Sequence, residues 1–389
     1  MSVTAPAGFV ASGHSAGIKS AGQPDLALVA TDDGAAVAAA AVFTQNKMTA
    51  APVITTYRHL DATGGRAAAV ILNSGNANAA TGSAGVEHAE RMCAGVADEL
   101  GCAPEEVLVA STGLIGISLP IDTIEAGVPA LVAGRDGGPD GGLAAADAIL
   151  TTDTVRKVSV VRGDGYSVGG LAKGAAMLAP DMATMLAVLT TDAEATPAEL
   201  KTALVSAMSS SFNALSVDGC TSTNDTVILL ASGRAGPVPA GALAASVAHV
   251  CQDLALQMAG DAEGATKVVK VTVTGAATDD QAAAGARKVA ESQLVKCSWY
   301  GQDPYWGRIA SELGTAGIGF DPDRISVSYG PHQVAAGGVT VDHDQAALTT
   351  YMQQRHLEVV ADLGLGTGTG TILTNDLTHA YIDENMGTS

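Results

Sequence analysis

The sequence predicts a mixed α/β protein in which sheets and helices pack in layers. Short apolar runs typical of buried strands alternate with longer segments of helical character, and this order is typical of layered α/β folds. Hydrophobic residues make up 47% of the chain but aromatic residues only 3%. At 389 residues, the chain is long enough to build several layers or more than one domain. We therefore expect a sheet-and-helix sandwich whose interior consists mainly of small aliphatic side chains.

The first third of the chain shows strands that lead into polar segments. Asn73–Asn78 reads as a turn-rich loop after one strand, and Ser111-Thr112-Gly113 as a small polar loop after another. Loops at strand ends often carry chemistry, so both are candidate site segments. The expected strands are 26–43, 66–72 and 106–110, and the expected helix is 83–100, ended by Gly101.

The middle of the chain contains the firmest local signals. Thr196-Pro197-Ala198-Glu199 forms a capping box with proline at the first helical position, which predicts a helix start. Asp164-Gly165 lies between two strand-like runs and predicts a hairpin. The glycine-rich run 134–142 is expected to be an exposed flexible loop, whereas the apolar run 182–190 fits a strand covered on both faces. The neighbouring expectations are a helix over 120–132 and hairpin strands over 157–161 and 166–168.

The last third continues the alternation of strands and helices. Gly364–Gly370 is rich in glycine, but it opens no helix and lacks the GxGxxG spacing of a nucleotide site. A flexible hairpin is the preferred interpretation there. The expected strands are 226–231 and 268–274, and the expected helices are 240–259 and 279–293.

Composition argues against several classes of function. A formal charge of -20 would repel a phosphate backbone, so we expect no nucleic-acid partner. The 8 histidines show no HExxH or similar pattern, so no metal site is expected. The 5 cysteines form no CxxC pair and read as buried thiols of a reducing compartment. With no signal-like segment and no run long enough to span a membrane, the expectation is a cytoplasmic protein.

One segment stands out, from Lys173 through Pro180-Asp181-Met182-Ala183-Thr184 to Leu186. Threonine favours strands, so a threonine in an apolar strand is on its own usually structural. The whole segment, however, resembles the signature of the ornithine acetyltransferase (bifunctional glutamate N-acetyltransferase) family. Further blocks resemble this family in the same order: Ala7–Phe9 with Ala16–Lys19, Val42–Asn46, Ile71–Asn78, Ala110–Gly116, Thr151–Thr154, Ser222–Thr226, Asp261–Lys267 and Asp303–Arg308.

The resemblance implies an enzyme that cuts its own chain between Ala183 and Thr184. The implied fragments are residues 1–183 and 184–389, which jointly form one fold related to the N-terminal-nucleophile enzymes and aminopeptidases. Thr184 then carries the acetyl group of N-acetylornithine to glutamate by a ping-pong mechanism. The family further implies a heterotetramer of two larger and two smaller fragments, small-molecule substrates and no required cofactor. Acetyl-CoA stays open as a second acetyl donor.

The resemblance also assigns the site residues. Thr112 and Gly113 match the pair that stabilises the oxyanion of the tetrahedral intermediate. The residues that match substrate contacts are Thr151, Lys173, Thr184, Glu263, Asn385 and Ser389. Lysine and glutamate have suitable charges for the carboxylate and the side-chain ammonium of N-acetylornithine.

The chain departs from the family pattern at three places. Tyr305 stands where asparagine is usual, Ala175-Ala176 replaces the usual pairing of a small residue with glycine, and the end Asn385–Ser389 is one residue short and lacks a tyrosine. Two alternatives remain open: a self-processing threonine amidase or aminopeptidase, and an uncleaved relative without catalytic activity. The first would pass its acyl group to water, and the second would show no cut.

Overall fold

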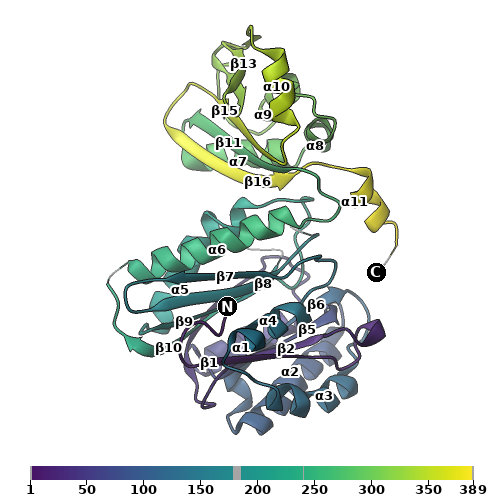
Figure 1. Ribbon diagram of the computed structural model, residues 1–389, viewed down its shortest axis with the longest axis vertical. Coiled ribbons are helices and arrows are strands. Elements are labelled where there is room, and N and C mark those ends of the chain that lie inside the picture. The colour runs from purple at the N-terminus through teal and green to yellow at the C-terminus, as the bar shows by residue number, and fades with distance from the viewer. Residues whose placement is uncertain (1, 178–184, 240, 388–389) are drawn as a thin grey trace. The chain divides into compact units, whose positions relative to one another are not determined.

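The computed structural model describes residues 2–177, 185–239 and 241–387 (Figure 1). These residues form two compact units. Unit 1 comprises Met1–Asn213 and Cys220–Met258, and unit 2 comprises Ala214–Gly219 and Ala259–Ser389. Unit 1 therefore contains chain from both sides of the predicted cut, whereas unit 2 contains chain only from the C-terminal side.

Unit 1 is built on two sheets that pack face to face. The first has the order β1-β2-β5-β6 and the second the order β4-β3-β10-β9-β8-β7. The strands of the first sheet are β1 (Phe9–His14), β2 (Leu26–Thr31), β5 (Ala69–Asn76) and β6 (Val107–Leu114). Those of the second are β3 (Val37–Phe43), β4 (Arg66–Ala67), β7 (Lys157–Arg162), β8 (Ser167–Lys173), β9 (Leu186–Ala193) and β10 (Thr226–Gly236).

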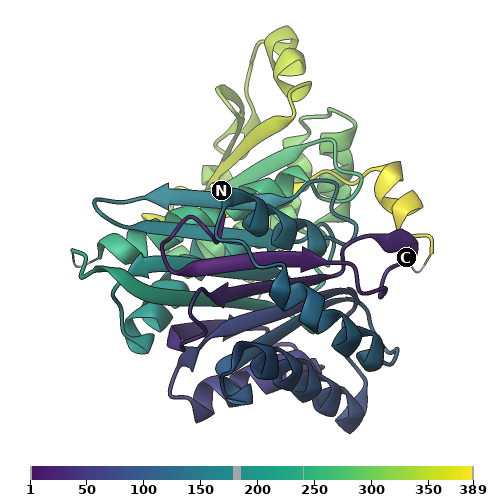
Figure 2. The same ribbon diagram turned by 60° about the horizontal axis from the view of Figure 1, so that its bottom comes forward.

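Helices cover the outer faces of the paired sheets. Helices α2 and α3 lie on the outer face of the first sheet, where Met92 and Ile124 pack against strand residues such as Ile71 (Figure 2). Helix α5 contacts β3 and β10, and α6 lies against Gly170 of β8. The helices of unit 1 are α1 (Ala51–Ala62), α2 (Gly82–Leu100), α3 (Ile121–Ala133), α4 (Pro139–Ala148), α5 (Pro197–Ser209) and α6 (Ala242–Gly260).

The space between the two sheets is filled by small aliphatic residues. Leu72 and Leu108 of the first sheet share one buried cluster with Val188 and Ile228 of the second. The layers thus run helix, sheet, sheet, helix, and the predicted α/β sandwich is confirmed. Ala, Val, Leu and Ile fill this interior because closely spaced sheets leave little room for aromatic rings.

The second sheet interleaves strands from both sides of residue 184. Strand β8 pairs with β9 antiparallel, and β3 pairs with β10 antiparallel. Strands β3 and β8 precede residue 184, whereas β9 and β10 follow it. A cut before Thr184 would therefore leave two chains that share continuous hydrogen-bonded ladders and one core.

Unit 2 is a separate α/β unit with its own core. Its sheet has the order β14-β13-β12-β15-β11-β16, α7 packs on β11 and β16, and Trp299 and Tyr329 are fully buried in the core. The strands are β11 (Val268–Ala276), β12 (Ser326–Tyr329), β13 (His332–Ala336), β14 (Val339–Thr340), β15 (His356–Asp362) and β16 (Gly368–Asn375). The helices are α7 (Asp279–Ala290), α8 (Gln293–Tyr300), α9 (Trp306–Leu313), α10 (Gln345–Met352) and α11 (His379–Glu384).

The firmest local predictions are confirmed. Thr196 accepts a hydrogen bond from the backbone of Glu199, and the Glu199 side chain accepts one from Thr196 in return, so the capping box is complete. Gly101 adopts the left-handed conformation that ends α2. The predicted hairpin over Asp164-Gly165 joins β7 and β8.

Predictions that rested on glycine and small polar residues were often wrong. Asn73–Asn76 and Ser111–Gly113 are not loops, because they extend β5 and β6 and pair with each other in parallel. The run 134–142 is not a flexible loop throughout, since α4 begins at Pro139 and buries Gly141 and Gly142.

Of two further predictions in unit 2, one was wrong and one is confirmed with a shorter range. Gly364–Gly370 does not join a hairpin, because β11 lies between β15 and β16 in the sheet. The helix expected near 279–293 is confirmed as α7, which ends at Ala290, and a second helix, α8, begins after the cap residue Ser292.

The cysteines are free, but they are not all buried. Cys93 and Cys251 are buried, Cys102 is half-buried, and Cys220 and Cys297 are exposed. Within the part of the chain that the structure describes, no helix combines the length and apolar character needed to cross a bilayer.

Candidate active site

Several strand ends meet at one place in unit 1. Leu186, the first residue of β9, pairs with Lys173 at the end of β8 on one side and with Thr226 at the start of β10 on the other. In the sequence, Thr184 precedes Leu186, the first residue of β9, by two positions. Ala183 and Thr184 themselves lie outside the described residues.

Lys173 and Thr112 link the two sheets at this end. Lys173 Nζ donates a hydrogen bond to Thr112 Oγ1 at 3.1 Å, and it lies 4.0 Å from Asp153 Oδ2. Only 8% of Lys173 is exposed. The Thr151 backbone N–H and hydroxyl donate to the same Asp153 oxygen at 3.2 and 3.5 Å. The structure therefore brings three of the predicted residues, Thr112, Thr151 and Lys173, into one polar cluster.

Asp153 is the centre of this cluster, although the sequence did not single it out as a site residue. Its Oδ1 accepts hydrogen bonds from Lys157 Nζ at 2.5 Å and from the Gly174 backbone N–H at 2.7 Å. Burial by itself raises the pKa of Asp153. The charges of Lys173 and Lys157 and the two hydrogen bonds outweigh burial and lower this pKa to about 2. Asp153 is thus a fixed anion that lies between the two lysines.

Gly113 lies in a position that only glycine can occupy. Its φ is +130°, and a Cβ there would come within 2.2 Å of the Gly75 carbonyl carbon. The reason is the parallel pairing of β5 and β6, which places Gly75 directly opposite Gly113 and leads into a bulge at Asn76. The Thr112–Gly113 backbone is therefore held by strand pairing.

A second buried carboxylate organises the loop next to the cluster. Asp25 accepts backbone hydrogen bonds from the predicted block Ala16–Lys19, at distances of 2.6 to 3.0 Å. Lys19 Nζ donates to the Leu150 carbonyl at 2.6 Å. Burial lowers the pKa of Lys19, and the charge of Lys173 lowers it further, against the opposing effect of Asp25. A second cation thus lies close to Lys173.

The block Ser222–Thr226 supports the same region. Asn224 Nδ2 donates to the carbonyls of Ala77 and Ser111 at 2.5 and 2.9 Å, which ties the start of β10 to the strand that carries Thr112. The next residue, Asp225, is 1% exposed and accepts a hydrogen bond from the Met185 backbone N–H. The sequence pattern identifies this block as family-like but assigns no role to Asp225.

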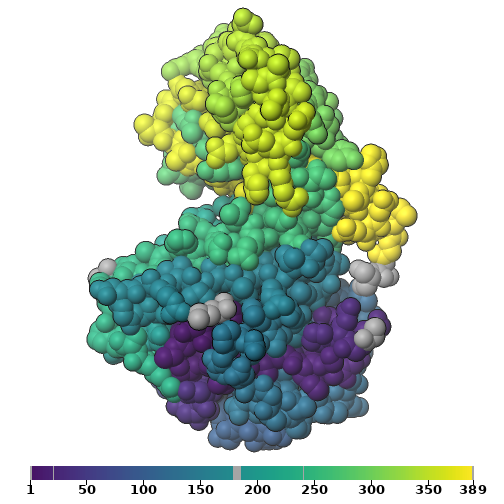
Figure 3. Space-filling model, viewed as in Figure 1, coloured from purple at the N-terminus to yellow at the C-terminus, as the bar shows by residue number. Residues whose placement is uncertain are grey.

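In unit 2, the structure brings Glu263 and Asn385 together. Asn385 Nδ2 donates to Glu263 Oε2 at 2.7 Å and to the Tyr381 carbonyl at 2.9 Å. Asn385 caps the end of α11, whose exposed surface is visible in yellow in Figure 3. Glu263 is 8% exposed. The last predicted contact, Ser389, lies outside the described residues.

The loop that carries Glu263 is fixed by Asp376 and Gly264. Asp376 accepts hydrogen bonds from the backbone N–H groups of Thr266 and Lys267, both at 2.9 Å. A Cβ on Gly264 would come within 2.3 Å of the Tyr381 nitrogen, so the loop approaches α11 closely. These contacts explain why glycine and small polar residues surround Glu263.

A cavity of about 120 Å³ lies beside Glu263 within unit 2. Lys296 lines it and donates to Thr374 Oγ1 at 3.0 Å. Burial lowers the pKa of Lys296 to about 8, while the nearby carboxylates of Asp218, Asp376 and Glu291 act in the opposite direction. Glu263 therefore shares this cavity with several other charged side chains, those of Lys296, Asp218, Asp376 and Glu291.

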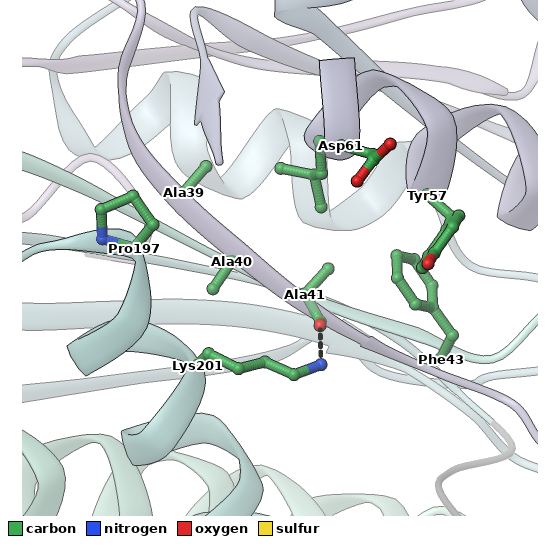
Figure 4. A pocket seen from close by; sticks show the side chains of 9 residues that line it. Ala39, Ala40, Ala41, Phe43, Tyr57, Asp61, Pro197 and Lys201 are labelled. Carbon is green, nitrogen blue, oxygen red and sulfur yellow. Dashed lines mark hydrogen bonds between the residues drawn. The ribbon is translucent and has the colours of Figure 1, made fainter. Parts of the chain in front are cut away.

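Another cavity in unit 1, of about 220 Å³, lies away from the predicted residues (Figure 4). Its floor is β3, and Lys201 of α5 donates to the Ala41 carbonyl at 2.7 Å. Phe43 and Tyr57 pack edge to face on its other side. Lys201 is engaged by its hydrogen bond to the Ala41 carbonyl of β3. The side chains around this cavity therefore do not converge on a point where acyl transfer could take place.

The fold and the buried polar cluster define an α/β enzyme with a site for small charged molecules. The model of the ArgJ family matches residues 10–387, and the chain belongs to this family. The predicted family and enzyme class, an acetyltransferase of arginine biosynthesis, are thereby confirmed.

Known relatives match over the full chain. The arginine biosynthesis bifunctional protein ArgJ of Thermobifida fusca is 47% identical, with 100% of each chain covered. The protein of the same description from Mycobacterium tuberculosis is 50% identical and is covered to 96%, with 100% of this chain. A crystal structure of ornithine acetyltransferase complexed with ornithine, also from M. tuberculosis, is 48% identical, with a TM-score of 0.45 over 47% of this chain and 96% of that chain.

Proposed function

We propose that this chain is a glutamate N-acetyltransferase that moves the acetyl group of N-acetylornithine to glutamate through an ester on Thr184. The products are ornithine and N-acetylglutamate. The observation that carries the proposal is the Lys173–Asp153–Thr112 cluster at the sheet end where β9 begins, in a chain of the ArgJ family. A cation, a fixed anion and a hydroxyl at the sheet end where β9 begins suit the binding of a charged amino-acid derivative.

The proposed nucleophile becomes active by a cut between Ala183 and Thr184. The cut frees an α-amino group on the residue that carries the hydroxyl, and an unperturbed α-amino group has a pKa of about 7.7 to 8.0. At neutral pH a useful fraction of this amine is unprotonated and accepts the hydroxyl proton. The mechanism then needs no histidine.

The oxyanion of the tetrahedral intermediate would be stabilised by Thr112 and Gly113. Because strand pairing holds this backbone in place, it needs little rearrangement when negative charge develops on the oxyanion. Removal of one hydrogen-bond donor to an oxyanion typically raises the activation barrier by about 2.7 to 4 kcal/mol. The Thr112 hydroxyl already accepts from Lys173, so its own proton is free to point elsewhere. This geometry supports a donor role for Thr112.

Substrate charges divide between the predicted residues. The family resemblance supports a role for Lys173 with Thr151 in binding a carboxylate, and a role for Glu263 with Asn385 in binding an ammonium group. Ser389 remains a proposed contact on the strength of the resemblance alone. Glutamate would use the same groups once ornithine has left, which gives ping-pong kinetics.

We extend the proposal to the oligomeric state, the cellular compartment and the cofactor requirement of the enzyme. We infer a heterotetramer of two larger and two smaller fragments, as the family resemblance implies. The free cysteines support a reducing, cytoplasmic setting. We propose that transfer between the two amino acids needs no cofactor, with acetyl-CoA as a second donor to be tested directly.

The decisive experiment follows ornithine release from N-acetylornithine with and without glutamate. Transfer requires that glutamate accelerate release and that N-acetylglutamate appear in equal amount. Release at the same rate without glutamate would instead indicate an amidase or aminopeptidase. Adding acetyl-CoA and glutamate alone tests the second donor.

The nucleophile is tested by mass spectrometry on protein incubated with donor alone. An acetyl adduct on the fragment that begins at Thr184 is expected. Thr184→Ala should abolish both the cut and the adduct, whereas Thr184→Ser keeps a hydroxyl and an amine and should retain part of both. Full activity in the alanine variant would rule out the assignment, and a single uncut wild-type species would indicate a non-catalytic relative.

A further inference from the structure

Asp225 is a buried carboxyl group that the transfer reaction does not use. It is 1% exposed, and its Oδ2 atom has no hydrogen-bond partner among the described residues. Buried polar atoms are nearly always paired, so an unpaired carboxyl oxygen in a core calls for an explanation. The residue stands just before β10, at the end of the sheet where Lys173 and the start of β9 also lie.

The carboxyl group of Asp225 contacts the residue that directly follows Thr184 in the chain. It accepts a hydrogen bond from the Met185 backbone N–H. Three covalent bonds join the Met185 nitrogen to the nitrogen of residue 184, so standard bond lengths keep these two nitrogens within about 4 Å. That second nitrogen is the leaving group when the Ala183–Thr184 bond breaks.

Self-cleavage has a chemical requirement that the later transfer does not share. Before the cut, the nitrogen of Thr184 is an amide and cannot act as a base, so another group must move the proton. We propose that Asp225 relays the proton from the Thr184 hydroxyl to the Thr184 nitrogen during self-cleavage. This inference rests on the proposed function, because it presupposes the cut before Thr184.

The step balances without a further reactant. The bond from the Thr184 oxygen to the Ala183 carbonyl carbon forms, the carbonyl carbon–nitrogen bond breaks, and the carboxyl group gives a proton to the departing nitrogen. The hydroxyl proton restores the carboxyl group. Water then hydrolyses the ester, which returns the hydroxyl and leaves a carboxylate on Ala183.

The surroundings of Asp225 favour the protonated form that this step requires. Burial raises its pKa well above the ordinary value, although hydrogen bonds with Met185, Ser222 and Thr44 and the charge of Lys173 act in the opposite direction. Lys173, on β8, is the charged group that acts on Asp225 among the described residues. A neutral carboxyl group can donate its proton at neutral pH, which an ordinary aspartate cannot.

The test compares Asp225→Asn with a matched control at the opposite end of β9. Asp192 is also a buried carboxylate of this sheet, and it accepts from the Ser167 and Ala7 backbones at 2.7 and 3.0 Å. Full-length chains are made by cell-free translation, and their cutting is followed by intact mass at several pH values. Loss of a general acid typically slows a step by about 100-fold or more.

We expect Asp225→Asn to cut at least about 100-fold more slowly than wild type, and Asp192→Asn to cut at a rate close to wild type. The wild-type rate should fall as the pH rises through the pKa of Asp225, and this fall should be missing in Asp225→Asn. Wild-type speed in Asp225→Asn, or equal slowing in both variants, would overturn the proposal. If Asp225→Asn fails to fold, as judged by thermal unfolding, Asp225→Glu is used and should keep the pH-dependent fall.

Hydroxylamine cleaves esters, so it shows whether the ester on Thr184 forms in each variant. A relay role in the shift from nitrogen to oxygen predicts that hydroxylamine releases no fragment from Asp225→Asn. Rapid release would show that the ester forms without Asp225 and would contradict the proposal. If the wild-type chain itself is never cut, the proposed function fails; if it is cut and Asp225→Asn is cut equally fast, only this inference fails.

Discussion

Individual residues in unit 1 show how a buried charge cluster can be stable. Lys157 and Asp153 are fully buried, and Lys173 is nearly so. Burying any one of these charges alone would be very costly, but each has partners of opposite charge or hydrogen-bond donors. The carboxylate between two lysines leaves one net positive charge, which is suited to an anionic substrate group.

Lys173→Ala should impair the reaction with N-acetylornithine more than it reduces the stability of the fold. It removes a cation and the donor to Thr112, and hydrogen bonds to charged groups contribute about 1.5 to 3 kcal/mol. We expect kcat/KM for N-acetylornithine to fall by roughly 10- to 100-fold. Steady-state kinetics provide the measurement, and Lys270→Ala, on an exposed lysine of β11, is the control. Equal kinetics in the two variants would contradict the role of Lys173.

Asp153 should contribute stability that depends on pH. Its folded pKa of about 2 lies below the ordinary aspartate value of 3.8, so its contribution to stability is fully present above pH 3.8 and is lost as the pH falls towards 2. The shift corresponds to ~2 kcal/mol at neutral pH. Asp153→Asn should therefore be less stable than wild type at pH 7, and the gap should narrow below about pH 4.

Denaturant unfolding of both proteins across this pH range measures the gap. Asp147→Asn, on a surface carboxylate paired with Arg156, should lose little at any pH. A gap for Asp153→Asn that stays constant down to low pH would show that the loss comes from altered packing and not from the charge.

Among the helices and strands, pairing between distant strands fixed the structure of segments that local sequence alone did not predict correctly. Ser111-Thr112-Gly113 looks like a turn because small polar residues and glycine favour turns. In the structure these residues pair with Asn73–Gly75, and the glycines are needed because the two backbones approach closely. By contrast, the capping box at Thr196 and the glycine end of α2 depend on neighbours in sequence and were predictable.

Gly113→Ala should damage the fold at the site more than a comparable change nearby. An added Cβ would meet the Gly75 carbonyl carbon at 2.2 Å, so β5 and β6 would have to separate. Gly116 also has a positive φ, but no atom lies within 4 Å of its added Cβ, and Gly116→Ala should cost only ~1 kcal/mol. Thermal unfolding compares the two variants; equal midpoints would contradict the packing argument.

At the scale of the whole molecule, the interleaved sheet of unit 1 makes the predicted fragments inseparable under native conditions. Strands β3 and β8 come from the first fragment and pair with β10 and β9 of the second. Their side chains also share the buried cluster between the sheets. Separation would expose this core and break two ladders at once.

We therefore expect cut protein to elute from size-exclusion chromatography as one species that contains both fragments. Its elution should match that of uncut Thr184→Ala, and the fragments should separate only in denaturant. The order of the strands is the reason, since neither fragment holds a complete second sheet. Elution of free fragments in native buffer would contradict this expectation.

The α/β layering, the helix caps, the hairpin over Asp164-Gly165 and, through family-like motifs, most residues of the candidate site could be predicted from the amino-acid sequence. These features depend on residue periodicity, on contacts between near neighbours or on long motif matches. Three features became visible only in the folded chain: the burial of Asp153 and Asp225 close to Lys173, the position of β11 between β15 and β16, and the separate core of unit 2. Such facts arise from pairing between distant strands and from burial, and local sequence carries no signal for either.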